Sequence, residues 1–273
     1  MMVARKRPAL TIVTINFNNA AGLAVTLKSY VNQQPSLIES ELLIIDGGST
    51  DESGAIARQF EKCDGIKWFS EPDNGVYDAM NKGIDQGQGD FYLFLNSGDS
   101  FAVPTALKTL YSGLASNPVW MIVGAWNLGG GHREPSIIRN IPHNWIRHAY
   151  GLQPHCHQAC LFRRDLVGGL GGYSEQFQFV GDFDFILRAG VVAPPLEIDD
   201  LLINYEGGGL SENLGDQIPA LLHNVRASRF GLAGGVRTAD NVWARAQQAR
   251  RRLSRRKNGL VKRISSRGQI DRG

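Results

Sequence analysis

Apolar runs and helical segments alternate from residue 9 to residue 95. Four runs are rich in β-branched, leucine or aromatic residues and are typical of strands; they span residues 9–16, 41–46, 66–71 and 91–95. Segments with helical spacing of apolar residues separate them, at residues 23–31, 49–60 and 76–85. Continuous apolar runs indicate strands covered on both faces. The alternation therefore predicts an α/β fold, with a mostly parallel sheet, helices on both faces and right-handed crossovers.

Local signals mark where two of these helices end and begin. Gln33-Gln34-Pro35 is a stop signal for the first helix, because proline cannot continue it. Ser49 and Glu52 have the spacing of a capping box, in which each side chain satisfies a free backbone amide. We therefore expect the second helix to open at Ser49.

Charge is divided unequally along the chain. The 273 residues carry a net charge of +3, yet 11 of the 29 Lys and Arg lie from Arg245 onward, with one acid, Asp271. The rest of the chain holds 18 basic and 25 acidic residues, a net charge of −7. A nucleic-acid-binding domain carries its positive charge on a face of the folded unit. An acidic body with a separate basic tail argues against nucleic acid as a partner.

Composition also bears on the compartment. The sequence has no apolar run long enough for a bilayer-spanning helix, and residues 1–10 are basic without the apolar core of a signal peptide. Cys63, Cys156 and Cys160 are an odd number in a long chain, which argues against a disulfide framework. We therefore expect a cytoplasmic protein.

Each of the four predicted strands ends in polar residues, and ligands of open α/β sheets bind at this edge. Three of the ends carry acids, including Asp46, Asp73 and Asp99. The loop after the first strand has neither a GxGxxG nor a GK[ST] sequence, which argues against dinucleotide and P-loop sites. Acids can face a polyphosphate when a hard cation lies between them, and Mg²⁺ or Mn²⁺ accepts both carboxylate and phosphate oxygens.

Several spaced motifs in this order resemble one family. “TIVTINFNN”, “ELLIIDGGSTDES”, “EPDNGVYDAMNKGI” and “GDFYLFLNSGD” are similar to family 2 inverting glycosyltransferases of the GT-A fold, particularly bacterial enzymes of exopolysaccharide, colanic-acid or O-antigen assembly. The similarity is close over residues 9–100 and looser as far as residue 211. It implies a Rossmann-like, mostly parallel sheet flanked by helices, with a helical basic C-terminal extension added in this chain.

The resemblance places a nucleotide-sugar site at the strand ends and the third helix. Phe17 matches the position of an aromatic residue that lies beside the nucleobase in the family. Asp46 matches the position of an acid that accepts hydrogen bonds from the base or the ribose. Asp78 lies at a position that usually faces the nucleotide in the family. The resemblance implies that Lys82, one turn later, approaches the diphosphate. The residues implied at this site are Phe17, Asn18, Asp46, Asp78, Lys82 and Ser97.

The resemblance also implies a metal ligand and a catalytic base. Asp99 matches the last acid of a metal motif in which Asn96 and Gly98 replace other acids, and the implied cofactor is Mn²⁺ or Mg²⁺. One carboxylate with phosphate oxygens and waters completes an octahedral shell. Asp182 is in register with the base that takes the acceptor's hydroxyl proton, and Asp184 is the second choice.

“HCHQAC”, residues 155–160, contains residue types that bind zinc, but its spacing matches no common zinc finger. His157 and Gln158 instead resemble an acceptor-side segment, so contact with the acceptor or the diphosphate is the preferred interpretation, and Asp184 is placed in the same group. The glycine-rich residues 206–211 are expected to form a flexible turn near the acceptor that orders when nucleotide binds.

Each of these assignments has a structural alternative. Asp46 and Asp99 are also typical of turns beside glycine. Phe17, taken alone, is typical of a core. Asp182 is equally typical of the first turn of a helix, where acids are favoured.

The motifs together predict an inverting, metal-dependent glycosyltransferase. It would transfer a sugar from a nucleotide donor, with uridine as the expected base, to a lipid-linked or oligosaccharide acceptor. The alternatives are a nucleotidyltransferase, which should have a Lys/Arg-rich loop after the first strand, and a catalytically silent sugar-nucleotide binder, which the missing acids suggest.

We expect the glycosyltransferase domain to span residues 1–235, with a donor half at 8–100 and an acceptor half at 101–235. Residues 236–273 are expected to form a basic C-terminal helix or tail. Its apolar residues at near-helical spacing are Val242, Ala246, Ala249 and Leu253. A basic amphipathic helix suits an anionic membrane surface, where a peripheral enzyme would meet a polyprenol-linked acceptor; a solvated tail is the alternative.

Overall fold

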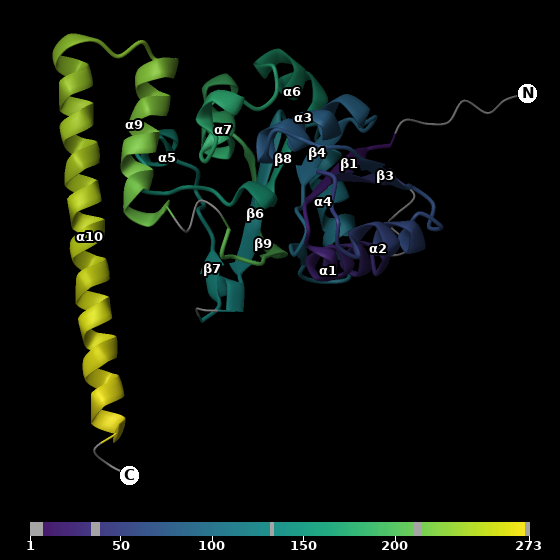
Figure 1. The fold of residues 1–273 in the computed structure, drawn as a ribbon. Helices are drawn as coiled ribbons and strands as arrows, with labels where there is room; N and C mark the ends of the chain where they lie inside the picture. Colours follow the sequence, from purple (N-terminus) through teal and green to yellow (C-terminus); the bar gives the residue numbers. More distant parts are fainter. Residues whose placement is uncertain (1–7, 34–38, 132–133, 210–213, 271–273) are drawn as a thin grey trace, which may run out of the picture.

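The computed structural model describes residues 8–33, 39–131, 134–209 and 214–270, with side chains as far as residue 254 (Figure 1). The described strands form one mixed sheet in the order β3-β2-β1-β4-β8-β6-β9-β5, with β7 paired to β6. Helices lie on both faces of this sheet, so the structure is an α/β fold as the alternation of runs predicts.

The first half of the sheet is entirely parallel. Its strands are β1 (Leu10–Asn16), β2 (Ser40–Asp46), β3 (Ile66–Ser70) and β4 (Phe91–Phe94). β1 lies between β2 and β4, and Asn16 is directly opposite Asp46 in register. The connecting helices are α1 (Ala20–Val31), α2 (Ser53–Phe60) and α3 (Val76–Gln86). Because the strands are parallel, their polar carboxyl ends meet at one edge.

The second half mixes strand directions. Its strands are β5 (Ser100–Phe101), β6 (Trp120–Asn127), β7 (Ser136–Ile138), β8 (Cys160–Arg163) and β9 (Leu196–Tyr205). β8 is antiparallel to both β4 and β6, whereas β9 is parallel to β6. β5 is antiparallel to β9, which brings the segment after β4 beside the end of β9.

Two apolar layers enclose the sheet. Along β2, Leu42 and Ile44 pack into a core with α1 and α4 (Ala106–Leu114), while Leu43 and Ile45 pack into the opposite core. That second core includes residues of α3, α6 (Arg164–Leu170) and α7 (Gly181–Val192). Successive side chains of a strand point to opposite faces, so burial of both faces explains why the strand sequences are continuously apolar.

A third, smaller core joins the end of the chain to this sandwich. It brings together α5 (Trp145–Ala149), α7, the short 3-10 helix η4 (Glu175–Phe177) and α9 (Ile218–Arg229). α10 (Gly234–Ile270) runs beside α9 and continues past it (Figure 1).

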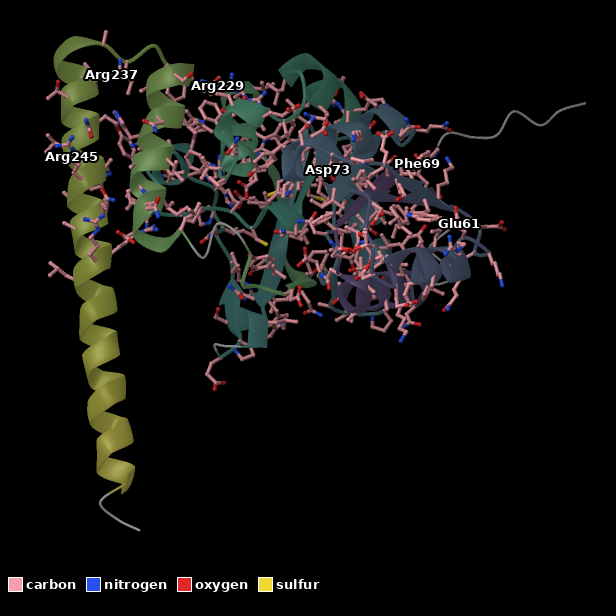
Figure 2. The ribbon with its side chains drawn as sticks, viewed as in Figure 1. Glu61, Phe69, Asp73, Arg229, Arg237 and Arg245 are labelled. Atoms are coloured by element: carbon pink, nitrogen blue, oxygen red, sulfur yellow. The ribbon has the colours of Figure 1, made fainter. Side chains whose placement is uncertain are left out.

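The side chains between α9 and α10 include a buried ionic cluster. Asp240 of α10 accepts hydrogen bonds from Arg226 of α9, at 3.0 Å, and lies 2.5 Å from the Nδ1 atom of His223. Arg237 and Arg245 lie on the same helix, on either side of Asp240 in sequence (Figure 2). None of the described helices combines the length and the hydropathy that crossing a bilayer requires.

The predicted capping box is wrong. α2 begins at Ser53, and no side chain caps it through Glu52. The Ser49 hydroxyl instead donates to Asp46 at 2.6 Å, and Asp51 accepts from the backbone amide of Ser53 at 3.0 Å. Ser49 is therefore held by the strand end before it and not by the helix after it.

Candidate active site

A cleft of about 860 Å³ opens at the carboxyl ends of β1 and β4. Segments far apart in the sequence line it: the loop after β1, the start of α3, the loop after β4, η4, the start of α7 and the end of β9. Five residues that the sequence predicts at the site lie on its wall outside the motif at 155–160: Phe17, Asp78, Ser97, Asp99 and Asp182.

Phe17 stands on the outer wall of the cleft, and 64% of its surface is exposed. This exposure excludes the alternative that Phe17 is a core residue. Asp73 lies beside it, because a Cβ added to Gly47 would fall 2.4 Å from Asp73 Oδ2 and 3.3 Å from the Phe17 ring. The Asp73 carboxylate also accepts from the Gly75 amide at 2.9 Å through Oδ1. An open aromatic face next to this carboxylate suits a flat heterocycle that carries N–H donors.

Asp46 has a different position from the one expected. It is 2% exposed and is not among the lining residues. Its oxygens accept from Asn16 Nδ2 at 2.8 Å, Ser70 Oγ at 2.7 Å, and both the amide and the hydroxyl of Ser49. Although burial alone would raise it, these hydrogen bonds hold the pKa of Asp46 below its ordinary value. In this geometry Asp46 shapes the turn after β2 and orients Asn16, which does line the cleft.

Asn18 and Lys82 also bind protein groups beside the cleft and do not line it. Asn18 accepts from the amide of Thr50 at 2.9 Å, which ties the loop after β1 to the loop after β2. Lys82 Nζ lies 2.8 Å from the Pro72 carbonyl and 3.5 Å from Asp78 Oδ2. Asn18 and Lys82 therefore hold loops in place, and other residues of these loops line the cleft.

Asp78 and Ser97 lie on the wall, and the side chain of each makes a hydrogen bond that fixes a neighbouring segment. Asp78 accepts from the amide of Asn74 at 2.8 Å and so fixes the loop before α3. The Ser97 hydroxyl donates to Asn16 Oδ1 at 2.8 Å. Ser97, Asn16 and Asp46 thus connect the ends of three adjacent strands.

Asp99 lies at the floor of the cleft and is 3% exposed. Its Oδ1 accepts from the amide of Glu206 at 2.9 Å. The Glu206 carboxylate is close, since a Cβ on Gly98 would fall 2.0 Å from Glu206 Oε2; Gly98 avoids this clash and adopts a φ of +103°. Burial, reinforced by the charge of Glu206, raises the pKa of Asp99 to about 7.

The floor of the cleft fits a hard cation. Asn96 Oδ1, also at the cleft, is buried and has no hydrogen-bond partner. Two carboxylates and an unsatisfied amide oxygen are ligand types that Mg²⁺ and Mn²⁺ prefer, and a cation would relieve the penalty of ionising Asp99. Among the described residues, no group of three or more His, Cys, Asp or Glu has a metal-binding arrangement, so oxygens of a bound substrate would be needed to complete the shell.

Asp182 lies in the first turn of α7, on the wall of the cleft. Its Oδ1 accepts from the Tyr77 hydroxyl at 3.2 Å and from the amide of Phe183 at 2.8 Å. Burial and the charge of Asp182 keep the pKa of Tyr77 well above its usual range, so the phenol stays protonated and donates. The carboxylate is thereby oriented while it remains at the cleft surface.

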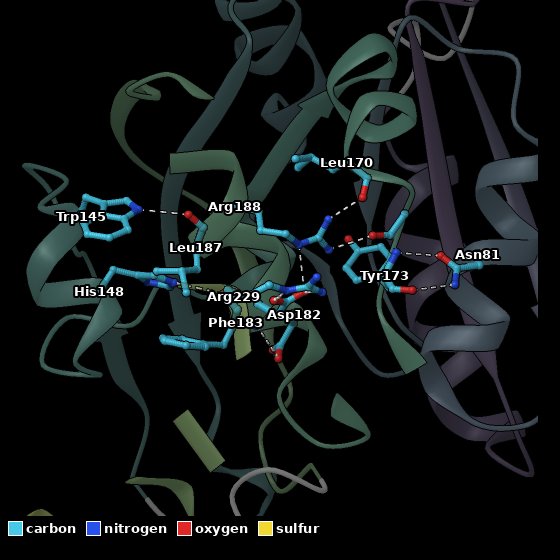
Figure 3. A network of polar contacts seen from close by, with 12 residues as sticks. Asn81, Trp145, His148, Leu170, Tyr173, Asp182, Phe183, Leu187, Arg188 and Arg229 are labelled. Carbon is cyan, nitrogen blue, oxygen red and sulfur yellow. Dashed lines mark hydrogen bonds and ion pairs between the residues drawn. The ribbon is translucent and has the colours of Figure 1, made fainter. Parts of the chain in front are cut away.

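Asp184 is fully buried and does not line the cleft. It accepts from Arg188 at 2.9 Å and from Arg229 of α9 at 2.5 Å and 2.8 Å. Arg188 also donates to the carbonyl oxygens of Leu170 and Gly172 (Figure 3). Asp184 is therefore placed as an anchor between α7, α9 and the loop after α6.

His157 and Gln158 both line the cleft, as expected from the sequence. His157 is 3% exposed and its Nε2 lies 2.6 Å from the Tyr173 hydroxyl. Burial lowers the pKa of His157 to about 4, so the ring is neutral. Cys156 donates its thiol to Gln158 Oε1 at 3.3 Å, and these contacts give the motif at 155–160 no zinc-binding arrangement.

The comparisons with known proteins settle the family. The sequence model described as “Glycosyl transferase family 2” matches residues 11–170. The chain is a family 2 glycosyltransferase. This membership excludes the nucleotidyltransferase alternative and confirms the resemblance on which the site residues were assigned.

Curated relatives agree with this family. An uncharacterized glycosyltransferase of Mycobacterium tuberculosis is 34% identical over 212 residues, which are 76% of this chain and 78% of the relative. A PGL/p-HBAD biosynthesis glycosyltransferase of Mycobacterium bovis is 31% identical over 228 residues, covering 77% of this chain and 82% of the relative.

Solved structures identify the fold as GT-A, which confirms the fold that the resemblance implies. S. aureus TarS in complex with UDP-GlcNAc superposes with a TM-score of 0.67 at 16% identity, over 90% of this chain and 72% of TarS. The mannosyltransferase PcManGT of Pyrobaculum calidifontis, in complex with GDP-Man and Mn²⁺, gives a TM-score of 0.63 at 14% identity, over 95% and 80% of the two chains.

The glycosyltransferase cleft also contains residues that have no predicted role. Asp73 follows β3 and is visible in the sequence as a strand-end acid, so its position was available from the pattern alone. Glu206 carries no such signal, because its place beside Asp99 depends on the pairing of β9 with β5. Tyr77 and Phe179 also line the cleft, and both are ordinary apolar positions in the sequence.

Proposed function

We propose that the protein catalyses inverting transfer of a sugar from a uridine diphosphate sugar to a hydroxyl group of a lipid-linked or oligosaccharide acceptor, in the assembly of surface glycans. One observation carries this proposal. Phe17, Asp99 and Asp182 come from three distant parts of the sequence and lie on the wall of a single cleft. An aromatic face, a buried acid and an accessible acid are the three groups that a nucleobase, a diphosphate with its cation and an acceptor hydroxyl require.

The donor would bind along the strand ends of the first half. The Phe17 ring offers a stacking surface for the base, and the Asp73 carboxylate beside it can accept from the base or ribose. Asp78 and Ser97 extend this wall toward Asp99. The TarS complex shows that a GT-A fold of this shape binds UDP-GlcNAc, which supports the choice of uridine.

The diphosphate would lie over Asp99 with Mn²⁺ or Mg²⁺. Asp99, Glu206 and Asn96 would hold the cation together with phosphate oxygens, and PcManGT with GDP-Man and Mn²⁺ is a precedent in the same fold. A bound cation supplies Lewis-acid stabilisation to the negative charge of the leaving diphosphate. The neutral Asn96 oxygen and the buried Asp99 carboxylate fit this role better than a surface site would.

Asp182 would act as the general base. Its carboxylate would accept the proton of the acceptor hydroxyl as that oxygen attacks the anomeric carbon from the face opposite the diphosphate. The Tyr77 hydroxyl and the Phe183 amide would hold the carboxylate in position during this transfer. Attack from the opposite face inverts the anomeric configuration.

The basic α10 is proposed to place the enzyme at an anionic membrane surface. Between Arg245 and residue 254 the helix carries Arg250, Arg251 and Arg252, and Trp243 and Leu253 are exposed on it. Cationic side chains and exposed apolar residues on one helix suit the interface of an anionic leaflet. This placement would bring a lipid-linked acceptor to the cleft.

Replacing the proposed base tests the function. We expect Asp182→Asn to bind UDP as tightly as the wild type, by calorimetry with Mn²⁺, and to lose at least 100-fold in transfer rate, because general-base catalysis contributes about 10²–10⁴. Asp85→Asn, at an exposed position of α3, is the matched control and should leave both measurements unchanged. Product of inverted anomeric configuration, read by NMR, completes the test.

Two results would contradict the proposal. Undiminished transfer by Asp182→Asn would remove Asp182 as the base. A wild-type protein that binds UDP but transfers no sugar to any of a panel of lipid-linked and saccharide acceptors would instead be a silent sugar-nucleotide binder.

A further inference from the structure

A second hollow, of about 400 Å³, adjoins the cleft on the side of Asp182. One wall is the segment 176–180, which leads from η4 into α7, and the other is α9. Gln178 and Phe179 line both this hollow and the cleft, so the two lie next to each other and share these residues as a common wall. We call this second hollow the η4–α9 groove.

The η4–α9 groove is lined by apolar side chains together with neutral polar ones, which are Gln176, Gln178, Asn224 and Ser228. Phe177 and Val180 are buried beneath it, and Phe179 is 38% exposed at the junction with the cleft. Leu221 contributes the apolar part of the α9 wall. Of the residues that the structure describes, none with a formal charge lines the groove, although the neighbouring cleft carries several acids.

The shape of the groove is fixed by the contacts behind it. Leu221, Asn224 and Ser228 are spaced i, i+3 and i+7, so they lie on one face of α9. The Arg229 guanidinium, which pairs with Asp184, also lies over the Phe177 ring at 5.3 Å. Arg229 of α9 is thus held against both Asp184 of α7 and Phe177 of η4, which joins the two walls of the groove.

We propose that the η4–α9 groove binds an uncharged apolar aglycone of the acceptor, such as an aryl ring or an alkyl chain. The inference rests on the proposed function, in which the acceptor hydroxyl lies at Asp182. Val180 lies two residues before Asp182, so the part of an acceptor that extends away from the donor meets this groove next. The neutral lining favours an acceptor whose hydroxyl or sugar is attached directly to the apolar group. It disfavours a polyprenyl diphosphate at this position, because no lining residue is charged and the neighbouring Arg229 is already paired with Asp184.

Matched acceptors that differ in the aglycone alone test the proposal. The probes are methyl, phenyl and octyl β-D-glucopyranoside, the last below its critical micelle concentration, titrated by calorimetry into the protein loaded with UDP and Mn²⁺. We expect the phenyl or the octyl glucoside to bind at least tenfold more tightly than the methyl glucoside, since burial of apolar surface drives the difference. The two probes distinguish an aryl from an alkyl preference.

Variants of α9 locate the binding. Ser228→Trp and Asn224→Trp fill the groove from exposed positions, and we expect either to reduce the tenfold gain to less than threefold with UDP affinity unchanged. Ser112→Trp, at an exposed position of α4 on the other side of the sheet, is the matched control and should keep the full gain.

The outcomes separate this inference from the proposed function. Failure of the wild type to bind UDP would overturn the proposed function itself. Normal UDP binding with equal affinity for the three glucosides, or with no measurable binding of any of them, would overturn the aglycone site and leave the groove as a contact for another protein. A tenfold gain that survives both α9 substitutions would place the aglycone elsewhere and equally overturn it.

Discussion

The two walls of the cleft, which are the proposed donor side at the strand ends and the proposed acceptor side at α7, hold a buried acid in different ways. On the donor side, Asp46 accepts hydrogen bonds from neutral hydroxyl and amide groups at the ends of adjacent strands. On the acceptor side, Asp184 is paired with two arginines, Arg188 of its own helix and Arg229 of α9. The first arrangement follows from the register of the strands. The second depends on a contact between α7 and α9, in which Asp184 and Arg229 are 45 residues apart in the sequence.

The position of one wall follows from the pairing of the strands, whereas the position of the other depends on contacts that are specific to this chain. Parallel strands bring their carboxyl ends together in any α/β fold, so the donor wall follows once the strands pair. The acceptor wall follows only if α9 docks on α7 through Arg229. We therefore expect the acceptor side to be the part that substitutions at the end of the chain can alter.

Removing the acceptor-side anchor should have the largest effect. Asp184→Asn would leave Arg188 and Arg229 without their anion in a buried site, and we expect the free energy of unfolding to fall by about 3–5 kcal/mol. Urea denaturation followed by circular dichroism measures the change. Asp165→Asn, which breaks the exposed pair with Arg163, is the control and should cost at most about 1 kcal/mol. Equal losses in the two variants would show that the buried pair is not an anchor.

The floor of the cleft and the donor wall should respond to pH in opposite directions. The pKa of Asp99 is raised to about 7, so between pH 4 and 7 the folded state holds a proton that the unfolded state has lost. In buffer without divalent cations, stability from this group is present at low pH and is lost as pH rises, by up to about 1.4 kcal/mol per pH unit. The pKa of Asp46 is lowered, so its contribution is present above pH 4 and is lost as pH falls further.

Asp99→Asn isolates the first of these effects. The free energy of unfolding of the wild type, measured against that of the variant from pH 4 to pH 8, should decrease with pH and level off above pH 7. A difference that does not change with pH would mean that Asp99 is ionised in the folded state throughout this range.

Phe17→Ala should have the smallest effect on stability and a clear effect on binding. Because the ring is exposed, the free energy of unfolding should change by no more than about 0.5 kcal/mol. Loss of one aromatic stacking surface should weaken UDP binding by about 10-fold, as measured by calorimetry. Phe17→Tyr keeps the ring and should retain the affinity; unchanged binding in both variants would place the base elsewhere on the donor wall.

The sequence predicts the sheet well because burial on both faces leaves an unambiguous signal. The strand predicted at residues 41–46 is β2 (Ser40–Asp46), and that predicted at 91–95 is β4 (Phe91–Phe94). The prediction of the capping box fails because the Ser49 hydroxyl donates to the Asp46 carboxylate. The capping-box pattern considers only the helix that follows and does not include this competing partner.

Site residues are predicted where one strand end suffices and are missed where two distant segments must meet. Phe17 and Asp99, whose roles the resemblance to the family implies, each follow the end of a single strand, and both line the cleft. Asp182 and Asp184 look equivalent in the sequence, but residues at i and i+2 of a helix point in different directions, so one faces the cleft and the other the arginines. The position of Glu206 at the cleft depends on the pairing of β9 with β5. The periodicity of apolar residues does not predict which strands pair.

α10 has a consequence for how the enzyme is delivered. At a rise of 1.5 Å per residue, its 37 residues span about 55 Å, and its buried ionic contact with α9 lies near its beginning, at Asp240. Its far end therefore extends well beyond the contacts that join it to α9 (Figure 1). A surface that binds this end would anchor the enzyme through α10. It would raise the local concentration of acceptor around the enzyme without changing the turnover of an acceptor already bound.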